Sequence, residues 1–237
     1  MHLFCSRKIR RNFRIFATIF HMKNFFKRID DFFFGHLQNH YAKELEKQCV
    51  GNESLLDVAC GSDSPVKYFS SKIKRVVGID IFEPSIEKSR AAGIHTEYRK
   101  MNVLDLEKEF GPKAFDVVVA SDLIEHLEKP DGFKLIEQME KVAKKKVVIY
   151  TPNGFLEQRE YDGNKYQVHL SGWEVEEMQK LGYKVYGING AKWLRGEFAV
   201  IKWWPKVFWG RISLLTQKRT FRNPKKAFGI LCVKEIK

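Results

Sequence analysis

Acidic side chains lie in or at the end of two apolar runs that are typical of strands. Asp57 lies in LLDVACGSD (55–63), and Asp80 is the last residue of VVGID (76–80). A carboxylate at the end of a second strand is placed to accept hydrogen bonds from both hydroxyls of a ribose. Asp57 and Asp63 add negative charge where a phosphate would otherwise bind. These residues predict a nucleoside pocket that favours a positively charged ligand.

The turn after the first of these runs lacks the common phosphate-binding patterns. Residues 57–63 read DVACGSD rather than G-x-G-x-x-G, and the sequence contains no G-K-[ST]. A dinucleotide needs the third glycine of that pattern and a helix N-terminus directed at its pyrophosphate. S-adenosylmethionine (SAM) fits better, because it carries a sulfonium and an ammonium but no phosphate.

At these residues the sequence resembles the class I SAM-dependent methyltransferases, in particular their small-molecule branch (type 11/23-like). The resemblance covers about residues 50–190. LLDVACG resembles the first motif of the family, VVGIDIFEP its ribose-binding acid, and KMNVLDLEKEFGPKAFDVVVASDLIEHL its third and fourth strands. The sequence departs from the family pattern at Ala59 and Asp63, where the family often has glycine, and at Asn102, where it often has aspartate.

The resemblance implies SAM as the cofactor and assigns contacts to matching positions. By that resemblance Asp57 and Gly61 line the methionine part of the cofactor, Asp80 and Ile81 contact the ribose, and Asn102 and Val103 flank the adenine. The implied cofactor residues, in chain order, are Asp57, Ala59, Gly61, Asp80, Ile81, Asn102, Val103, Ser121 and Asp122.

Histidines after the fourth and fifth predicted strands are the candidates for catalysis. Methyl transfer from a sulfonium is an in-line displacement, so positioning and desolvation supply most of the rate. A base is needed only when the acceptor must lose a proton, as a hydroxyl does. We expect His126 to act as that base and His169 to contact the substrate; the alternatives are local packing for His126 and a hydrogen bond within its loop for His169. Further candidates in the same segment are Asn153, Tyr161, Asn164 and Trp173.

The residues around His126 also suggest a second kind of site. Asp122, Glu125 and His126 resemble the D/E-x-x-E-H arrangement that some quinone-type O-methyltransferases use for a divalent metal. We predict no metal ligand from the sequence, and this alternative remains open at this stage.

Sequence patterns of nucleic-acid methyltransferases are absent. No [DNS]-P-P-[YF] follows the fourth predicted strand, and TPNG after the fifth is a different element. None of Cys5, Cys49, Cys60 and Cys232 follows either strand, where cytosine C5-methylating enzymes carry their nucleophile. Nucleic acid is therefore the less favoured substrate.

Alternating apolar runs and helical patterns predict the fold. The strand-like runs are 55–59, 76–80, 95–99, 115–121, 147–151, 183–188 and 228–233, and the helical patterns are roughly 65–72, 84–92, 131–143 and 171–181. Ser64 before Pro65 predicts an N-cap, and Ser171 with Glu174 predicts a capping box. This order predicts an α/β, Rossmann-like fold, with a seven-stranded, mostly parallel sheet and helices on both faces.

The basic residues are concentrated at the two ends of the sequence. The formal net charge is +13; residues 1–48 carry +6 and 191–237 carry +10, whereas the segment between them is mildly acidic. We expect 1–48 to form a basic amphipathic helical arm, because apolar residues at 15–33 recur at helical spacing. The methyltransferase domain is expected over 49–237.

An aromatic insertion, 198–227, precedes the last predicted strand. It places Trp203, Trp204, Phe208 and Trp209 among lysines and arginine, with Ile201, Trp204, Phe208 and Leu215 at helical spacing and Pro205 starting the helix. Such a stripe is consistent with core packing, with an anionic membrane surface or with RNA. We expect it to be partly a lid over the pocket and partly an interfacial contact.

The sequence therefore predicts transfer of a methyl group from SAM to a small-molecule or lipid-like acceptor, at oxygen. The alternatives are an RNA methyltransferase whose basic ends hold phosphates, and a non-catalytic SAM-binding or membrane-adaptor protein. Cysteines without paired spacing and the lack of a long apolar run predict a cytoplasmic protein, peripheral on the inner membrane face. Nothing in the sequence predicts the oligomeric state.

Overall fold

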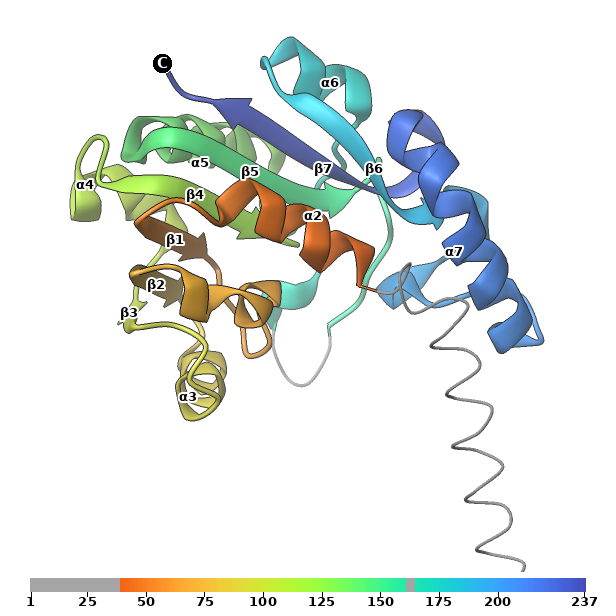
Figure 1. Cartoon of the computed structure of the whole chain (residues 1–237), viewed down its shortest axis with the longest axis horizontal. Coiled ribbons are helices and arrows are strands. Elements are labelled where there is room, and N and C mark those ends of the chain that lie inside the picture. Colours follow the sequence, from red (N-terminus) through yellow and green to blue (C-terminus); the bar gives the residue numbers. More distant parts are fainter. Residues whose placement is uncertain (1–38, 161–164) are drawn as a thin grey trace, which may run out of the picture. The chain divides into compact units, whose positions relative to one another are not determined.

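The computed structural model describes residues 39–160 and 165–237 (Figure 1). The predicted amphipathic stripe of 15–33 and the candidate residues Tyr161 and Asn164 lie outside the described residues. Within the described residues, no helix is both long enough and apolar enough to cross a membrane.

A seven-stranded sheet forms the centre of the described structure. Its strands lie in the order β3-β2-β1-β4-β5-β7-β6. The first five pair in parallel, and β7 runs antiparallel to both β5 and β6, so the predicted mostly parallel sheet is confirmed. The strands are β1 (Ser54–Val58), β2 (Arg75–Asp80), β3 (Glu97–Lys100), β4 (Phe115–Ser121), β5 (Ala143–Pro152), β6 (Lys184–Ala191) and β7 (Ala227–Glu235).

Both faces of the sheet are buried. Alternate residues of each central strand point to opposite faces; in β1, Leu56 and Val58 belong to one apolar cluster and Leu55 to the other. This explains the unbroken apolar runs, because a parallel sheet that is covered on both faces needs apolar side chains at every position. The helices are α2 (His40–Cys49), α3 (Glu83–Ala91), α4 (Leu106–Phe110), α5 (Lys129–Val142), α6 (Val175–Lys180) and α7 (Lys206–Arg222).

Helix α2 belongs to the compact unit. It crosses one face of the sheet (Figure 1), and Leu45 and Cys49 are fully buried in the apolar cluster there. The compact unit accordingly begins at Asn39, ten residues before the start that we expected for the domain. The last turns of the expected arm are therefore part of the domain core.

Two local predictions differ from the structure. The predicted helix at 65–72 is a pair of 3-10 turns, Pro65–Tyr68 and Ser70–Lys72, although the Ser64 hydroxyl accepts from the Val66 amide as expected (3.2 Å). The predicted capping box at Ser171 is wrong. Its hydroxyl donates to the Ile124 carbonyl (3.1 Å), and α6 starts only at Val175. A tertiary contact has taken the hydroxyl that a local cap would use.

Helix α7 covers the open edge of the sheet with polar side chains. It starts after Pro205, as predicted, and runs beside β6 (Figure 1). The Gln217 side chain accepts from the Gly190 amide and donates to the Gly187 carbonyl, both at 2.9 Å. An edge strand leaves such backbone groups unpaired, so this side chain completes the sheet. Two apolar residues of α7, Phe208 and Leu215, are exposed instead, whereas Phe221 near its end packs on Tyr186 of β6.

Candidate active site

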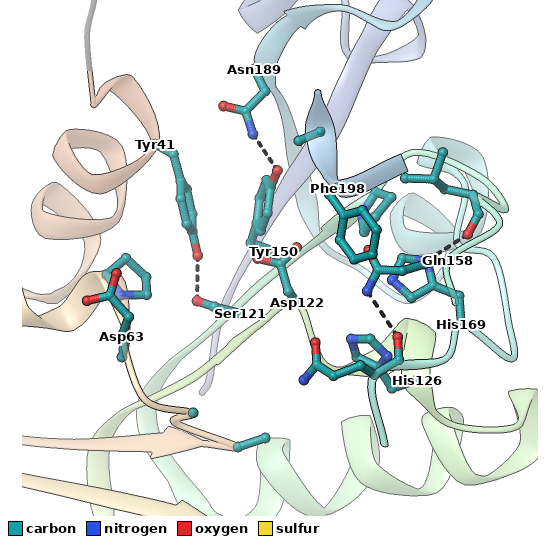
Figure 2. Close-up of a pocket in the computed structure, with 18 of the residues that line it drawn as sticks. Tyr41, Asp63, Ser121, Asp122, His126, Tyr150, Gln158, His169, Asn189 and Phe198 are labelled. Atoms are coloured by element: carbon teal, nitrogen blue, oxygen red, sulfur yellow. Dashed lines mark hydrogen bonds between the residues drawn. The ribbon is translucent and has the colours of Figure 1, made fainter. Parts of the chain in front are cut away.

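A cavity of about 430 Å³ opens at the carboxyl ends of β1 and β4. Ligands in open α/β sheets bind at this edge of the sheet. Seven predicted site residues line the cavity: Asp57, Ala59, Gly61, Ser121, Asp122, His126 and His169. The remaining walls come from α2, β5, β6 and the 198–227 insertion (Figure 2).

Asp57 is held rigidly at the end of β1. Its side chain is buried, and its Oδ2 accepts from the Ser64 hydroxyl at 2.6 Å and from His95 Nε2 at 2.8 Å. The His95 imidazole fits here because Gly78 has no side chain; a Cβ there would lie 2.9 Å from the ring. His95 was missed by the sequence analysis, because it precedes β3 and reaches Asp57 only through the pairing of strands.

The turn after β1 is connected to the predicted ribose acid. Gly61 has a φ of 58°, in the left-handed region that favours glycine, and its amide donates to Asp80 Oδ2 at 2.9 Å. The Phe82 amide donates to the other oxygen at 2.8 Å. Burial raises the pKa of Asp80, and these backbone hydrogen bonds partly offset that rise. Ala59 also has a positive φ, 55°, so it adopts the conformation for which the family often has glycine.

The predicted adenosine residues lie beside the cavity rather than in it. Asp80 ends β2, and Ile81 follows it with a partly exposed side chain. Asn102 is exposed after β3, and its side chain accepts from the Leu104 amide at 3.0 Å. Val103 is buried in the core. Because β1, β2 and β3 are parallel neighbours, these residues share one sheet edge with the cavity.

The cavity is acidic. Asp57, Asp63 and Asp122 line it, burial raises the pKa of Asp122 to about 7, and no lysine or arginine of the described residues lines it. Lys67 pairs with Asp63 at 2.5 Å but lies outside the cavity wall. In a partly desolvated pocket, such an arrangement attracts cations and repels phosphates.

His126 and His169 meet across the cavity wall, with ring centroids 4.7 Å apart (Figure 2). His126 Nδ1 donates to the Val168 carbonyl at 3.1 Å, and His169 Nδ1 donates to the Leu156 carbonyl at 2.6 Å. A carbonyl only accepts, so the proton of each neutral ring is on Nδ1, and Nε2 keeps its lone pair. Burial lowers the pKa of His126 to about 4 and also lowers the pKa of His169.

The loop that carries His169 is tied to the turn that carries His126. The amides of Leu170 and Ser171 both donate to the Glu125 carbonyl, at 2.8 and 3.0 Å, and Trp173 Nε1 donates to the Ile124 carbonyl at 3.1 Å. These bonds bring together two histidines that are 43 positions apart in the sequence.

Glu125 directly precedes His126 in the sequence and is almost fully buried, at 2% exposure. Its Oε2 accepts from the Thr151 hydroxyl at 2.9 Å, whereas Oε1 has no hydrogen-bond partner. Burial and the neighbouring Asp122 raise the pKa of Glu125 well above its ordinary value. A buried, unpartnered carboxylate oxygen is costly, so it requires an explanation.

Aromatic side chains also line the cavity, two of them beside the acids. The Tyr41 hydroxyl and the Ser121 hydroxyl lie 2.5 Å apart, and the Tyr41 ring stacks on Tyr150 with centroids 4.1 Å apart (Figure 2). Asn189 donates to the Tyr150 hydroxyl at 2.6 Å, and Phe198 contributes from the insertion. None of these four aromatic and amide side chains was predicted for the site; Phe198 supports only the expected lid role of the insertion.

Two other predicted candidates have structural roles. Trp173 is fully buried in the core, where its indole nitrogen bonds Ile124 and Ser171. Asn153 is buried and donates to the carbonyls of Pro224, Lys225 and Ala227. Neither lines the cavity, so their candidacy as substrate contacts was wrong.

Comparison with known proteins agrees with the fold. Residues 56–151 match a family model described as "Methyltransferase domain". Among solved structures, the chain is similar to a SAM-dependent methyltransferase from Archaeoglobus fulgidus, with a TM-score of 0.57 and 18% identity over 89% of this chain and 99% of that one. No curated protein matches the chain in sequence.

Two further solved structures show the same fold. One is phosphoethanolamine N-methyltransferase 2 from Haemonchus contortus in complex with SAM, with a TM-score of 0.52 and 18% identity over 84% of this chain and 52% of that one. The other is the methyltransferase domain of bacterial CtHen1-C, with a TM-score of 0.53 and 12% identity over 84% and 98%.

Proposed function

Because this chain carries a methyltransferase domain of the class I fold, with SAM as its cofactor, we propose that it methylates a small-molecule or lipid-like acceptor at oxygen. The observation that carries this proposal is one cavity lined by acidic side chains, aromatic side chains and two imidazoles.

The acidic side chains of the cavity suit the charged part of SAM. Asp57 favours the sulfonium and the ammonium, and the turn at Gly61 joins this part of the cavity to Asp80, which would hold the ribose. In this orientation the adenosine lies along the carboxyl ends of β2 and β3, and the methyl group enters the cavity.

The aromatic side chains suit an apolar acceptor of limited size. Tyr41, Tyr150 and Phe198 line the cavity, and its volume of about 430 Å³ is of the size that proteins use for small ligands. Flat or hydrocarbon-rich molecules bind well to such walls. An RNA chain would instead need an open basic groove, whereas no lysine or arginine of the described residues lines this cavity.

The two imidazoles support methylation at oxygen, because a hydroxyl acceptor needs a group that takes its proton. In the reaction the acceptor oxygen attacks the methyl carbon, the carbon–sulfur bond breaks, and S-adenosylhomocysteine leaves. The hydroxyl proton must be accepted, and Nε2 of His126 or His169 has a free lone pair for it.

We also propose that α7 and the segment before it contact an anionic membrane from the cytoplasmic side. Trp204 is 86% exposed, and Trp203 and Phe208 are at least half exposed, beside the exposed Lys202 and Lys206. Aromatic and basic residues together favour the headgroup region, and each basic residue adds up to about 1 kcal/mol near anionic lipid. A lipid-like acceptor would be met at such a surface.

Labelled methyl groups test the acceptor class. The purified protein is incubated with methyl-labelled SAM and an extract of its host, which is then separated into organic, aqueous, nucleic-acid and protein fractions. We expect label in the organic or small-molecule fraction. Label in RNA would instead establish the alternative enzyme, and label in no fraction would favour a non-catalytic SAM-binding protein.

A further inference from the structure

We propose that Glu125, His126 and His169 bind a divalent first-row transition-metal ion at the edge of the cavity. One ligand atom from each side chain lies within 4.8 Å of the other two. The set differs from the Asp122–Glu125–His126 arrangement that the sequence suggested, because His169 takes the place of Asp122. His169 reaches this site through the tertiary contacts between the 165–171 segment and the turn at 124–126.

Both imidazoles are oriented in the way that metal-binding histidines are. Each uses Nδ1 to donate to a backbone carbonyl, Val168 or Leu156, so Nε2 is left as the coordinating atom. In metalloproteins such outer hydrogen bonds fix the tautomer and the ring orientation of the ligand. Here the backbone bonds of Leu170 and Ser171 to Glu125 fix the loop as well.

The third ligand explains the unpartnered oxygen. Glu125 is 2% exposed, and Thr151 holds Oε2 and leaves Oε1 without a partner. A cation would satisfy this atom, just as Thr151 satisfies the other. Metal–ligand bonds are about 2.0–2.2 Å long, so the three side chains would close in when the ion binds.

The ligand types select the ion. Two imidazoles and one carboxylate suit Zn²⁺, Mn²⁺, Fe²⁺ or Co²⁺, whereas Mg²⁺ and Ca²⁺ prefer oxygen ligands alone. Three protein ligands leave coordination positions open, and both histidines line the cavity in which the acceptor would bind. This role rests on the proposed function and takes the place of direct proton transfer to an imidazole, because the ion would occupy both Nε2 lone pairs: the ion would bind the acceptor hydroxyl and lower its pKa, so that the proton leaves to water.

Metal binding is measured on the full-length protein without reference to methyl transfer. The protein is stripped with EDTA and titrated with Co²⁺, Zn²⁺, Mn²⁺ and Mg²⁺, with calorimetry for all four and visible absorption for Co²⁺. We expect one transition-metal ion per chain and much weaker binding of Mg²⁺. His169→Asn and Glu125→Gln should each weaken Co²⁺ binding at least tenfold and change its absorption spectrum.

His40→Asn is the matched control, because His40 lies on α2 and does not line the cavity; it should bind metal like the wild type. Thermal unfolding establishes that each variant is folded. Gln158→Ala is a second control, because Gln158 lines the same cavity as the two histidines and is not one of the three proposed ligands. Absence of binding, or equal binding by wild type and folded His169→Asn, would overturn the site.

The two proposals fail separately. Histidine-dependent metal binding without methyl transfer to any fraction would leave the metal site intact and reject the proposed reaction. Methyl transfer that persists after EDTA treatment, together with no metal binding, would reject the metal site and leave the imidazoles as direct proton acceptors.

Discussion

Asp57 and Asp80 are the two side chains on which we expect cofactor binding to depend most. Each has its carboxylate oriented before any ligand arrives: Asp57 by Ser64 and His95, and Asp80 by the amides of Gly61 and Phe82. Such preorganisation reduces the ordering that binding would otherwise require. The hydrogen bond from the Gly61 amide to Asp80 also connects the turn that follows Asp57 to the second acid.

Asp80→Asn is expected to weaken SAM binding about tenfold or more, because hydrogen bonds to charged groups contribute about 1.5–3 kcal/mol. The substitution keeps the size of the side chain and removes its charge. Isothermal titration calorimetry provides the measurement, with Glu87→Gln, an exposed acid farther along α3 that pairs with Arg90, as the control. Unchanged affinity in Asp80→Asn would reject the ribose assignment.

His95→Asn should weaken SAM binding through Asp57, roughly tenfold, because a buried polar partner is lost at about 1–3 kcal/mol. A double-mutant cycle with Asp57→Asn separates positioning from general destabilisation. If His95 positions Asp57, the second substitution adds little to the first. Fully additive losses in SAM affinity would show that His95 has no such role.

At the residue scale, the sequence predicts what lies next to a strand end. Asp57, Gly61 and Asp122 lie on the cavity because a strand of apolar residues leads directly to each of them. Tyr41 and His95 could not be predicted in this way, because neither follows a strand and both reach the site across the fold. The same holds for the pairing of His126 with His169.

At the scale of elements, α7 is unusual because its polar face is the buried one. Ser213, Gln217 and Thr220 are buried, whereas Phe208 and Leu215 are 54% and 58% exposed. The apolar stripe in the sequence was correctly read as helical in part, yet the stripe alone cannot tell which face meets the sheet. That depends on the free backbone groups of β6, which need polar partners.

Gln217→Leu is expected to lower the free energy of unfolding by about 2–4 kcal/mol, because the Gly190 amide and the Gly187 carbonyl each lose their partner inside the protein. Urea denaturation followed by circular dichroism measures the change. Lys218→Ala, the exposed neighbour on the same helix, should stay within about 0.5 kcal/mol of the wild type. Equal stability of Gln217→Leu and wild type would refute the edge-covering role.

Strand positions were predictable because buried parallel strands must be apolar throughout. Two predictions about helix starts failed. Ser171 was expected to cap a helix, but its hydroxyl bonds Ile124 and accepts from Trp173. Pro65 was expected to open an α-helix, but the segment that follows it makes only 3-10 turns. For Ser171, the outcome depended on a contact with a residue far away in the sequence.

At the scale of the whole molecule, charge is divided between the reaction site and the surface. The cavity is acidic, whereas residues 191–237 carry a net +10. This division matches the two proposals made above, a cationic cofactor in the cavity and an anionic surface outside it.

Membrane binding is expected to depend on aromatic residues in α7 and just before it. The double variant Trp204→Ser and Phe208→Ser should lose most of its co-sedimentation with phosphatidylglycerol vesicles at low salt, because both side chains are exposed and available to the headgroup region. Tyr68→Ser, an exposed aromatic elsewhere, should sediment like the wild type. Wild-type protein that stays wholly in the supernatant would reject the membrane contact.

The most direct test of the central claim is a crystal structure of the protein with S-adenosylhomocysteine. We expect the ribose hydroxyls on Asp80, the adenine along the carboxyl ends of β2 and β3, and the sulfur at the Asp57–Gly61 end of the cavity, facing His126 and His169. A nucleoside bound elsewhere, or a sulfur directed away from the two histidines, would contradict the proposed site and the reaction assigned to it.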